Sequence, residues 1–161
     1  MVSSLILFQT FSSLRFTLSG VNLSILSMFN GFIFNHIGVA VFSIAKTAKV
    51  YAAAGYTQSE TVFDPVQHIH ICFLHKADMP IVELLEPVDD KSPVVETLKK
   101  NGVTPYHTCY EVANMAEAAA TLKQHKFLPL GKAVEAVAFG GRSVQFFYHK
   151  DVGLIEIVEA I

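Results

Sequence analysis

The chain has 161 residues, of which 52% are hydrophobic and only 16% are charged. This composition excludes a disordered or fibrous protein, and the length suits one domain with a real core or two small halves that share one. A net charge of −2, with no cluster of Lys and Arg, gives no reason to expect a nucleic-acid partner.

The two cysteines, Cys72 and Cys109, each stand inside an apolar run typical of a strand. A disulfide framework is therefore not indicated, and both residues are expected to be small core side chains. A reducing compartment follows as the default, so the sequence favours a cytoplasmic protein.

Residues 1–27 differ from everything after them, because they are rich in Ser, Leu and Phe and carry one charge, Arg15. A secretory signal would begin with basic residues, and a transit peptide would usually carry several arginines. A membrane span needs about 20 predominantly apolar residues, which polar side chains interrupt here. We interpret residues 1–27 as an upstream extension outside the fold, with mitochondrial targeting as the alternative, and place the working domain at residues 28–161.

The first half of this domain is expected to be a strand, a helix and three more strands. A β-branched run with small residues predicts a strand over 36–41, and Ser43 can cap a helix over 44–54 that Gly55 ends. Three short strands with turn residues between them then follow, over 57–64, 67–74 and 80–87.

A connector leads to the second half. Ser92 followed by Pro93 predicts the N-cap and first position of a helix over 94–101. The order of elements then repeats, beginning with a strand over 106–112.

A capping box of Asn114 and Glu117 predicts the next helix, over 115–126. Three strands separated by glycine-containing turns are then expected, over 133–139, 143–150 and 154–160.

The repeat places a histidine early in the first strand and a glutamate in the last strand of each half. These residues are His36 and Glu83 in the first half, and His107 and Glu156 in the second. Two halves packed about a pseudo-twofold axis would bring all four side chains together. We also expect small residues beside His36, such as Gly38, to leave room for a ligand, because alternate strand residues share a face.

Two neutral imidazoles and two carboxylates suit a borderline divalent ion such as Zn, Co, Ni or Mn. Without an ion, the cluster would bury two like charges at a cost of several kcal/mol. A lone strand histidine is more often a hydrogen-bonded core residue, and a lone strand glutamate more often faces solvent. Four such residues in register across two halves favour a metal site.

With this repeat, the sequence resembles the vicinal oxygen chelate superfamily (glyoxalase, bleomycin resistance protein and dioxygenase), over about residues 34–160. The resemblance is greatest to methylmalonyl-CoA epimerases, through the Glu-Leu-Leu-x-Pro run at 83–87, the Ser-Pro before the connecting helix, and the His-x-Cys-x-Glu-Val strand at 107–112. It implies an α+β fold in which paired βαβββ modules, 34–88 and 104–160, form a cupped mixed sheet around a metal. It also implies that His36, Glu83, His107 and Glu156 are the metal ligands.

One departure from the resemblance concerns the acid/base chemistry. These epimerases usually carry a Glu, one of two acid/base groups, where Val66 stands here. Asp64 and His68 are the candidates to replace it. The resemblance assigns the other proton transfer to Glu156, because the matching family residue both binds metal and moves the proton.

The sequence therefore predicts a metal-dependent enzyme that transfers a proton next to a carbonyl, with an acyl-CoA thioester as substrate. A glyoxalase I-like lactoylglutathione lyase, acting on a hemithioacetal, is the enzyme alternative. A small-molecule-binding protein of the resistance type is the alternative from another class, and the presence of all four ligands favours an enzyme. Superfamily members are often homodimers.

Other residues carry weaker expectations. His68 and His70 could bind metal from one strand face, although an exposed edge strand is the favoured interpretation. Arg142, after two glycines, either places a cation near an anionic substrate or is a solvated residue of a hairpin turn. His149 and Lys150 could act in the same way as Arg142. Several aromatic residues are expected in the core, namely Tyr110, Phe146, Phe147 and Tyr148.

Overall fold

The computed structural model describes residues 28–161. The interpretation of residues 1–27 as an extension therefore lies outside the described residues. Within residues 28–161, no helix is long and apolar enough to cross a membrane.

The first module contains one long strand, one helix and four shorter strands, followed by the connecting helix. Ser43 caps helix α1, as expected, by accepting a hydrogen bond from the Lys46 backbone N–H. The elements are β1 (Phe32–Ala40), α1 (Ile44–Ala53), β2 (Thr57–Gln58), β3 (Val62–Asp64), β4 (Ile69–His75), β5 (Ile81–Pro87) and α2 (Val95–Asn101).

The second module repeats this order. Asn114 caps helix α3 by accepting hydrogen bonds from the backbone N–H groups of Ala116 and Glu117. The elements are β6 (Thr104–Val112), α3 (Met115–Gln124), β7 (Leu128–Pro129), β8 (Val134–Glu135), the 3-10 helix η1 (Val137–Phe139), β9 (Ser143–His149) and β10 (Gly153–Glu159).

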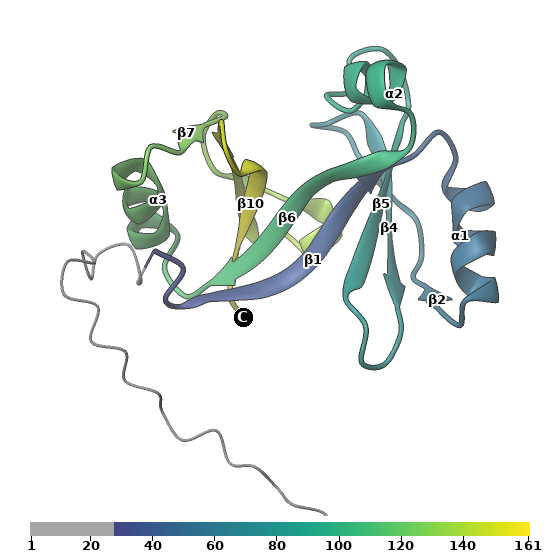
Figure 1. The fold of residues 1–161 in the computed structure, drawn as a ribbon, viewed down its shortest axis with the longest axis horizontal. Helices are drawn as coiled ribbons and strands as arrows, with labels where there is room; N and C mark the ends of the chain where they lie inside the picture. Colours follow the sequence, from purple (N-terminus) through teal and green to yellow (C-terminus); the bar gives the residue numbers. More distant parts are fainter. Residues whose placement is uncertain (1–27) are drawn as a thin grey trace, which may run out of the picture.

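The two modules join through their first strands into one mixed sheet. Its order is β2-β4-β5-β1-β6-β10-β9-β7, with β3 paired to β4 and β8 paired to β9. β1 and β6 are antiparallel to each other, whereas β5 is parallel to β1 and β10 is parallel to β6. In Figure 1, β1 and β6 run as long neighbouring ribbons between the two halves, with α1 beside one half and α3 beside the other. The predicted α+β fold of paired modules is confirmed.

Each module has its own apolar core between its helix and the outer face of its half of the sheet. In the first, Ile44 and Ala48 of α1 pack against strand residues such as Leu74 and Leu84. The second core is formed in the same way by α3 and strands β6, β9 and β10, with Ala118, Ala119, Leu122, Phe147, Ile155 and Ile157. Because the helices cover the outer face, the inner face of the sheet is left for the site.

Four local predictions are wrong. The strand expected over 57–64 is interrupted and forms two short strands, β2 and β3, which each pair with β4. The strand expected over 133–139 is a two-residue strand followed by the 3-10 helix η1. Ser92 does not cap α2, which begins at Val95, and its buried hydroxyl makes no hydrogen bond within residues 28–161. β1 begins at Phe32 and β6 at Thr104, both before the expected residues, because the two strands pair with each other over the added residues.

The aromatic side chains are only partly in the core. Phe147 is fully buried, but Tyr148 is 44% exposed, so its prediction is wrong. Tyr110 is half-buried in a cluster with Phe29, Phe32 and Phe34, while Phe146 faces the site. The expectation for the cysteines is confirmed, because both thiols are free and buried.

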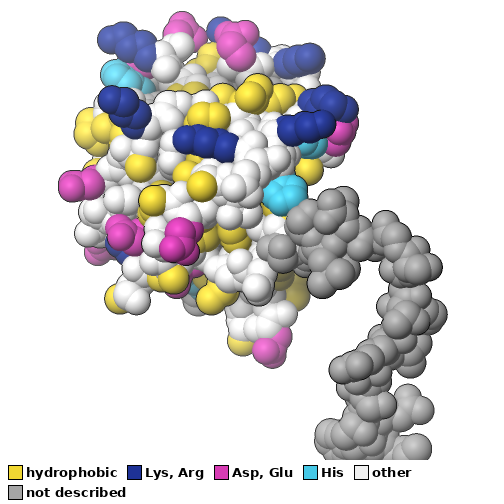
Figure 2. All heavy atoms as spheres, turned by 90° about the vertical axis from the view of Figure 1, so that its left-hand side faces the viewer, with side chains coloured by type: hydrophobic (Ala, Val, Ile, Leu, Met, Phe, Trp, Pro, Cys, Tyr) yellow, Lys and Arg dark blue, Asp and Glu magenta, His cyan; other side chains and the backbone are white. Residues whose placement is uncertain are grey.

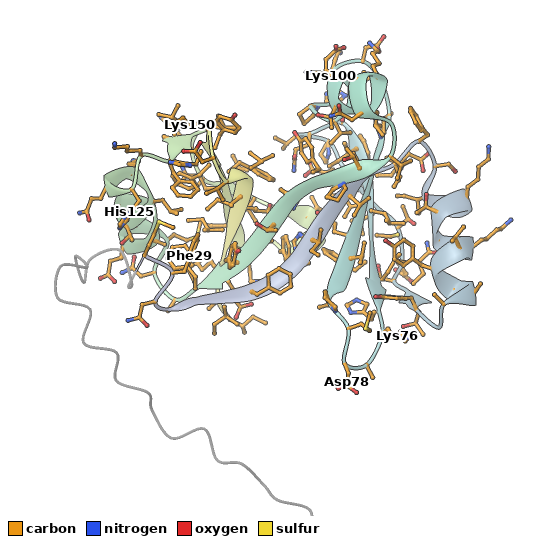
Figure 3. All side chains as sticks on the ribbon, viewed as in Figure 1. Phe29, Lys76, Asp78, Lys100, His125 and Lys150 are labelled. Atoms are coloured by element: carbon orange, nitrogen blue, oxygen red, sulfur yellow. The ribbon has the colours of Figure 1, made fainter. Side chains whose placement is uncertain are left out.

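Charged side chains are spread over the surface. Figure 2 shows basic and acidic side chains on the same face of the molecule, with apolar and uncharged polar groups between them. In Figure 3 the labelled Lys76 and Asp78 lie at the β4–β5 turn, and His125 and Lys150 lie in the other half. These residues are far from the middle of the sheet, where the site is formed.

Candidate metal centre

His36 lies in β1 beside a β-bulge. The pairing of β1 with β6 passes from Phe34–Tyr110 to His36–Cys109, so Asn35 is an extra residue. A bulge bends its strand and re-aims nearby side chains. Asn35 Oδ1 lies 3.0 Å from His36 Nδ1, which can donate to it and leave the lone pair of Nε2 directed at the cluster.

His107 lies in β6 beside a second bulge. Here the pairing passes from Gly38–His107 to Val39–Pro105, so Tyr106 is the extra residue. A Cβ at Gly38 would overlap the His107 imidazole. The room that we expected the small residues of β1 to leave for a ligand is thus occupied, at Gly38, by the His107 ring.

The two glutamates reach the same place from the flanking strands. Glu83 of β5 pairs with Gly38, and Glu156 of β10 pairs with Cys109. In both modules the glutamate therefore stands opposite the residue two positions after the module's histidine. The two halves of the site are equivalent in register as well as in sequence order.

The four predicted residues converge on one point in the structure. The Nε2 atoms of His36 and His107 are 3.1 Å apart, and Glu83 Oε2 lies 3.2 and 3.3 Å from them. Glu156 Oε2 lies 3.6 and 3.4 Å from the same two nitrogens. All four ligand atoms lie within 4.8 Å of one another, and each residue is at most 4% exposed.

This donor set fits a divalent cation. Four ligands about 2.0–2.1 Å from a tetrahedral ion are roughly 3.3–3.4 Å apart, close to the separations found here. Within residues 28–161, the buried Glu156 Oε2 makes no hydrogen bond, and a cation would satisfy it. Two buried carboxylates facing two imidazole nitrogens also need positive charge for stability.

The pKa values show how strongly these groups interact. Burial by itself would lower the pKa of His107, but its contacts with Glu156 and Glu83 outweigh burial and raise it to about 9. Burial would raise the pKa of Glu83, yet His107 and His36 lower it to about 2. Without an ion the cluster therefore retains a proton beside ionised carboxylate, and a divalent ion could replace that proton.

Cys109 lies beside the cluster but is not suited to act as a nucleophile. Burial and the nearby charge of Glu156 raise the pKa of its thiol well above the ordinary value. It remains a neutral thiol at physiological pH, packed against Val144 and Val158.

An apolar pocket of about 330 Å³ lies next to the centre, between the two modules. It borders the cluster through Tyr106 and Phe146, whose rings stand edge-on to His107 at centroid distances of 5.8 and 5.3 Å. Its lining residues are Val66, Gln67, Pro93, Tyr106, Leu130, Gly131, Lys132, Val134, Val144, Gln145, Phe146 and Leu154.

The other charged candidates lie elsewhere. Arg142 is neither a solvated turn residue nor part of the pocket lining, because its Nη1 donates to Glu111 Oε2 at 3.2 Å and to the Glu159 carbonyl at 3.0 Å. Lys150 pairs with Asp151, and neither it nor His149 lines the pocket. The expectation that these cations face a substrate gains no support.

The His68–His70 pair does not form a second metal site among the described residues. His68 lies in the turn before β4 and contacts Asp89, while the His70 ring lies against Phe63 at a tilt of 42°. The expectation of an exposed edge strand is wrong too, because β3 pairs with β4 along this stretch.

Sequence reasoning noted Tyr106, which stands where the resemblance would place a second histidine, but missed other residues that shape the site. Asn35 precedes His36 as Tyr106 precedes His107, and this matching position in the repeat was an available signal. The role of Gly38 and the position of Phe139 depend on contacts between strands distant in sequence, so no local pattern indicates them.

The comparisons with known proteins place this chain in a class. The sequence profile of the Glyoxalase/Bleomycin resistance protein/Dioxygenase superfamily matches residues 35–146. The chain belongs to this superfamily.

Within the superfamily, several of the relatives found are epimerases. The chain is 30% identical over 125 residues to the ethylmalonyl-CoA/methylmalonyl-CoA epimerase of Cereibacter sphaeroides, covering 73% of this chain and 88% of that protein. The methylmalonyl-CoA epimerase of Mycobacterium tuberculosis has the same fold, with a TM-score of 0.71 at 21% identity over 80% of this chain and 87% of that one.

A variant of the Streptomyces coelicolor methylmalonyl-CoA epimerase, in complex with 2-nitronate-propionyl-CoA, is similar at a TM-score of 0.69. It is 25% identical, and the match covers 80% of this chain and 96% of that one. The sequence-based identification of the superfamily and of its epimerase branch is therefore confirmed.

Proposed function

We propose that this protein is a metal-dependent enzyme of the methylmalonyl-CoA epimerase type. It moves a proton on the carbon next to the thioester carbonyl of an acyl-CoA. The observation that carries the proposal is the buried cluster of two imidazoles and two carboxylates beside an apolar pocket. The epimerase relatives, one of them bound to an acyl-CoA analogue, support the substrate class.

His36, Glu83, His107 and Glu156 are the residues that would hold the ion. Their two-nitrogen, two-oxygen donor set suits Zn, Co, Ni or Mn. When bound, such an ion supplies Lewis-acid stabilisation of negative charge on a carbonyl oxygen.

Glu156 is the proposed base. Its Oε2 makes no hydrogen bond within residues 28–161, whereas Glu83 Oε2 lies closer to both imidazoles. On the same face of β10, Leu154 lines the pocket, so Glu156 points toward the side from which a substrate comes. A carboxylate so placed can remove a proton from a bound substrate and return it.

A second acid/base group is hard to find around the pocket. Asp64 Oδ1 accepts hydrogen bonds from the backbone N–H groups of Val66 and Gln67, and its Oδ2 accepts from the Gln67 side chain. His68 contacts Asp89 instead. Of the two residues considered as replacements at this position, neither has a side chain free to act on the pocket.

This observation favours a second candidate function, glyoxalase I-like isomerisation of a hemithioacetal. In that reaction one group can remove a proton and return it to the neighbouring carbon. Among residues 28–161, Tyr106 and Lys132 are the only titratable residues that line the pocket, and no carboxylate does. A single base at Glu156 would suffice for this chemistry.

Solvent-deuterium exchange distinguishes the candidates. The purified protein is first analysed for bound metal, and is then incubated with methylmalonyl-CoA in D₂O. Exchange with inversion supports an epimerase, and exchange without inversion indicates one working base. No exchange, together with turnover of hemithioacetal, would overturn the leading proposal.

Substitution of Glu156 tests the base. Glu156→Gln should lower the exchange rate by about 10²–10⁴-fold, because it removes the proton acceptor. The matched variant Glu159→Gln changes a carboxylate at the end of the same strand and should leave the rate unchanged. If Glu156→Gln retained both metal and full exchange, the assignment of the base would be wrong.

The cytoplasm is the proposed location and a homodimer the proposed assembly. The free, buried thiols of Cys72 and Cys109 support a reducing compartment. Size-exclusion chromatography with light scattering would test the assembly, and fractionation of the native cells would test the location.

A further inference from the structure

The metal centre is closed on every side by the protein. Its four ligand residues are at most 4% exposed, and none of them lines the neighbouring pocket. A substrate oxygen can therefore reach the ion only if some side chain around the centre moves. Aromatic rings cover both histidines, and the two covers are built differently.

The cover over His36 is fixed. The Phe139 ring stacks on the His36 imidazole at a centroid distance of 5.8 Å and an interplanar angle of 26°. Arg142 holds the turn that carries it, with Nε 3.3 Å from the Phe139 carbonyl oxygen and the guanidinium carbon 5.2 Å from the ring centroid. Arg142 is itself held by Glu111 and by the Glu159 carbonyl. These contacts account for Arg142, to which the catalytic proposal assigns no role.

The cover over His107 is held by packing alone, with Tyr106 against the buried cluster that includes Leu85 and Val94. Tyr106 and Phe146 stand edge-on to the His107 ring, and both also line the pocket. Tyr106 is the extra residue of a β-bulge, so no residue of β1 is paired opposite it. No hydrogen bond to another residue within 28–161 holds its side chain. A ring at a bulge, beside an empty apolar volume of about 330 Å³, has room to turn aside.

We propose that Tyr106 is the specificity-determining residue of this site. Its ring separates the pocket from the metal centre and must turn aside when a substrate oxygen approaches. The size of the group next to the reacting carbon is then limited by the space that the displaced ring leaves. This inference rests on the proposed function, since it assigns the pocket to the acyl end of the substrate.

Access to the metal can be measured without turnover. Acetohydroxamate, a small ligand with two oxygens, is mixed with the cobalt-substituted protein, and binding is followed by the visible spectrum. Tyr106→Ala should raise the association rate about tenfold or more, while Tyr148→Ala, at an exposed residue outside the pocket lining, should leave it near that of the unchanged protein. Faster binding in Phe139→Ala with no change in Tyr106→Ala would overturn the proposal.

Substrate preference gives the second measurement. Tyr106→Ala should raise kcat/KM for ethylmalonyl-CoA relative to methylmalonyl-CoA about tenfold, the effect expected when a pocket gains room for one methylene group. An unchanged ratio together with an unchanged hydroxamate rate would refute the role of Tyr106. If Tyr106→Ala fails to fold, Tyr106→Leu retains apolar packing and is expected to change both quantities in the same direction.

The two proposals can fail separately. A protein that binds cobalt but turns over neither thioester refutes the proposed substrate class, while the hydroxamate rates still decide the role of Tyr106. A protein that binds no cobalt or other divalent ion refutes the metal centre, and the role of Tyr106 with it.

Discussion

The two modules supply matching halves of one site, yet the surroundings of the two histidines differ. Both histidines follow a bulge residue, and both glutamates pair with the residue two positions further along the histidine's strand. In the first module the bulge residue, Asn35, contacts the histidine ring. In the second it is Tyr106, which leaves His107 Nδ1 without a hydrogen bond within residues 28–161. The repeat thus positions the four residues of the cluster, whereas its differences leave His36 held by a hydrogen bond and His107 beside the pocket.

The positions two residues after the histidines differ as well. Gly38 in the first module leaves space for the His107 ring, while Cys109 in the second packs into the core. The symmetric placement of the four cluster residues therefore depends on different residues at these two matching positions.

The largest effect on metal affinity should come from a substitution at Gly38, the smaller of these two residues. Gly38→Ala puts a methyl group where the His107 imidazole lies, so the ring must move and a ligand is lost. We expect metal affinity to fall by more than about 100-fold, beyond the usual cost of disturbing a residue that only supports a ligand. Competition with a chromophoric chelator measures the affinity.

The matched change in the other module is Cys109→Ala. It should cost about 1 kcal/mol of unfolding free energy and leave metal affinity unchanged, because the thiol fills space without touching an ion. If Gly38→Ala bound metal as well as Cys109→Ala does, the close approach of His107 to β1 would be wrong.

A smaller effect is expected at the bulge residues. Asn35→Ala removes the partner of His36 Nδ1 and should weaken metal binding about 10–100-fold. Tyr106→Phe, at the matching position, should bind metal with unchanged affinity, because the tyrosine hydroxyl makes no contact with a ligand. Equal losses in both variants would contradict the view that only the first module holds its histidine by a hydrogen bond.

A further effect is the dependence of stability on pH. In the metal-free protein the pKa of His107 is raised to about 9, so its stabilisation is complete below about 6.5 and is lost as pH rises through 9. Glu83, with its pKa lowered to about 2, stabilises the fold above about 4.5 and loses this effect as pH falls toward 2. The metal-free protein should therefore lose up to about 1.4 kcal/mol per pH unit between 6.5 and 9.

The metal-loaded protein should respond in the opposite direction, because metal binding requires deprotonated imidazole and strengthens as pH rises. Urea unfolding at several pH values, with and without zinc, measures both curves. Parallel curves would show that the ion and the proton do not compete for His107.

Sequence alone was sufficient to identify the repeat, most of the elements and all four residues of the cluster. These follow from short-range signals, such as apolar alternation, helix caps and glycines in turns, and from the likeness of one half to the other. The sequence was less informative at residues 133–139, where alternation suggested a strand. Only Val134 and Glu135 form a strand there, and the 3-10 helix η1, which carries Phe139, follows them.

Only the tertiary structure decided how the site is assembled and closed. The bulges at Asn35 and Tyr106, the space above Gly38 and the ring of Phe139 over His36 all depend on how strands far apart in sequence pair and pack. A one-residue shift in register moves every side chain to the other face of a strand, and no local pattern records where such a shift occurs. The four residues of the cluster could therefore be predicted from the sequence, whereas the way in which the protein encloses them could not.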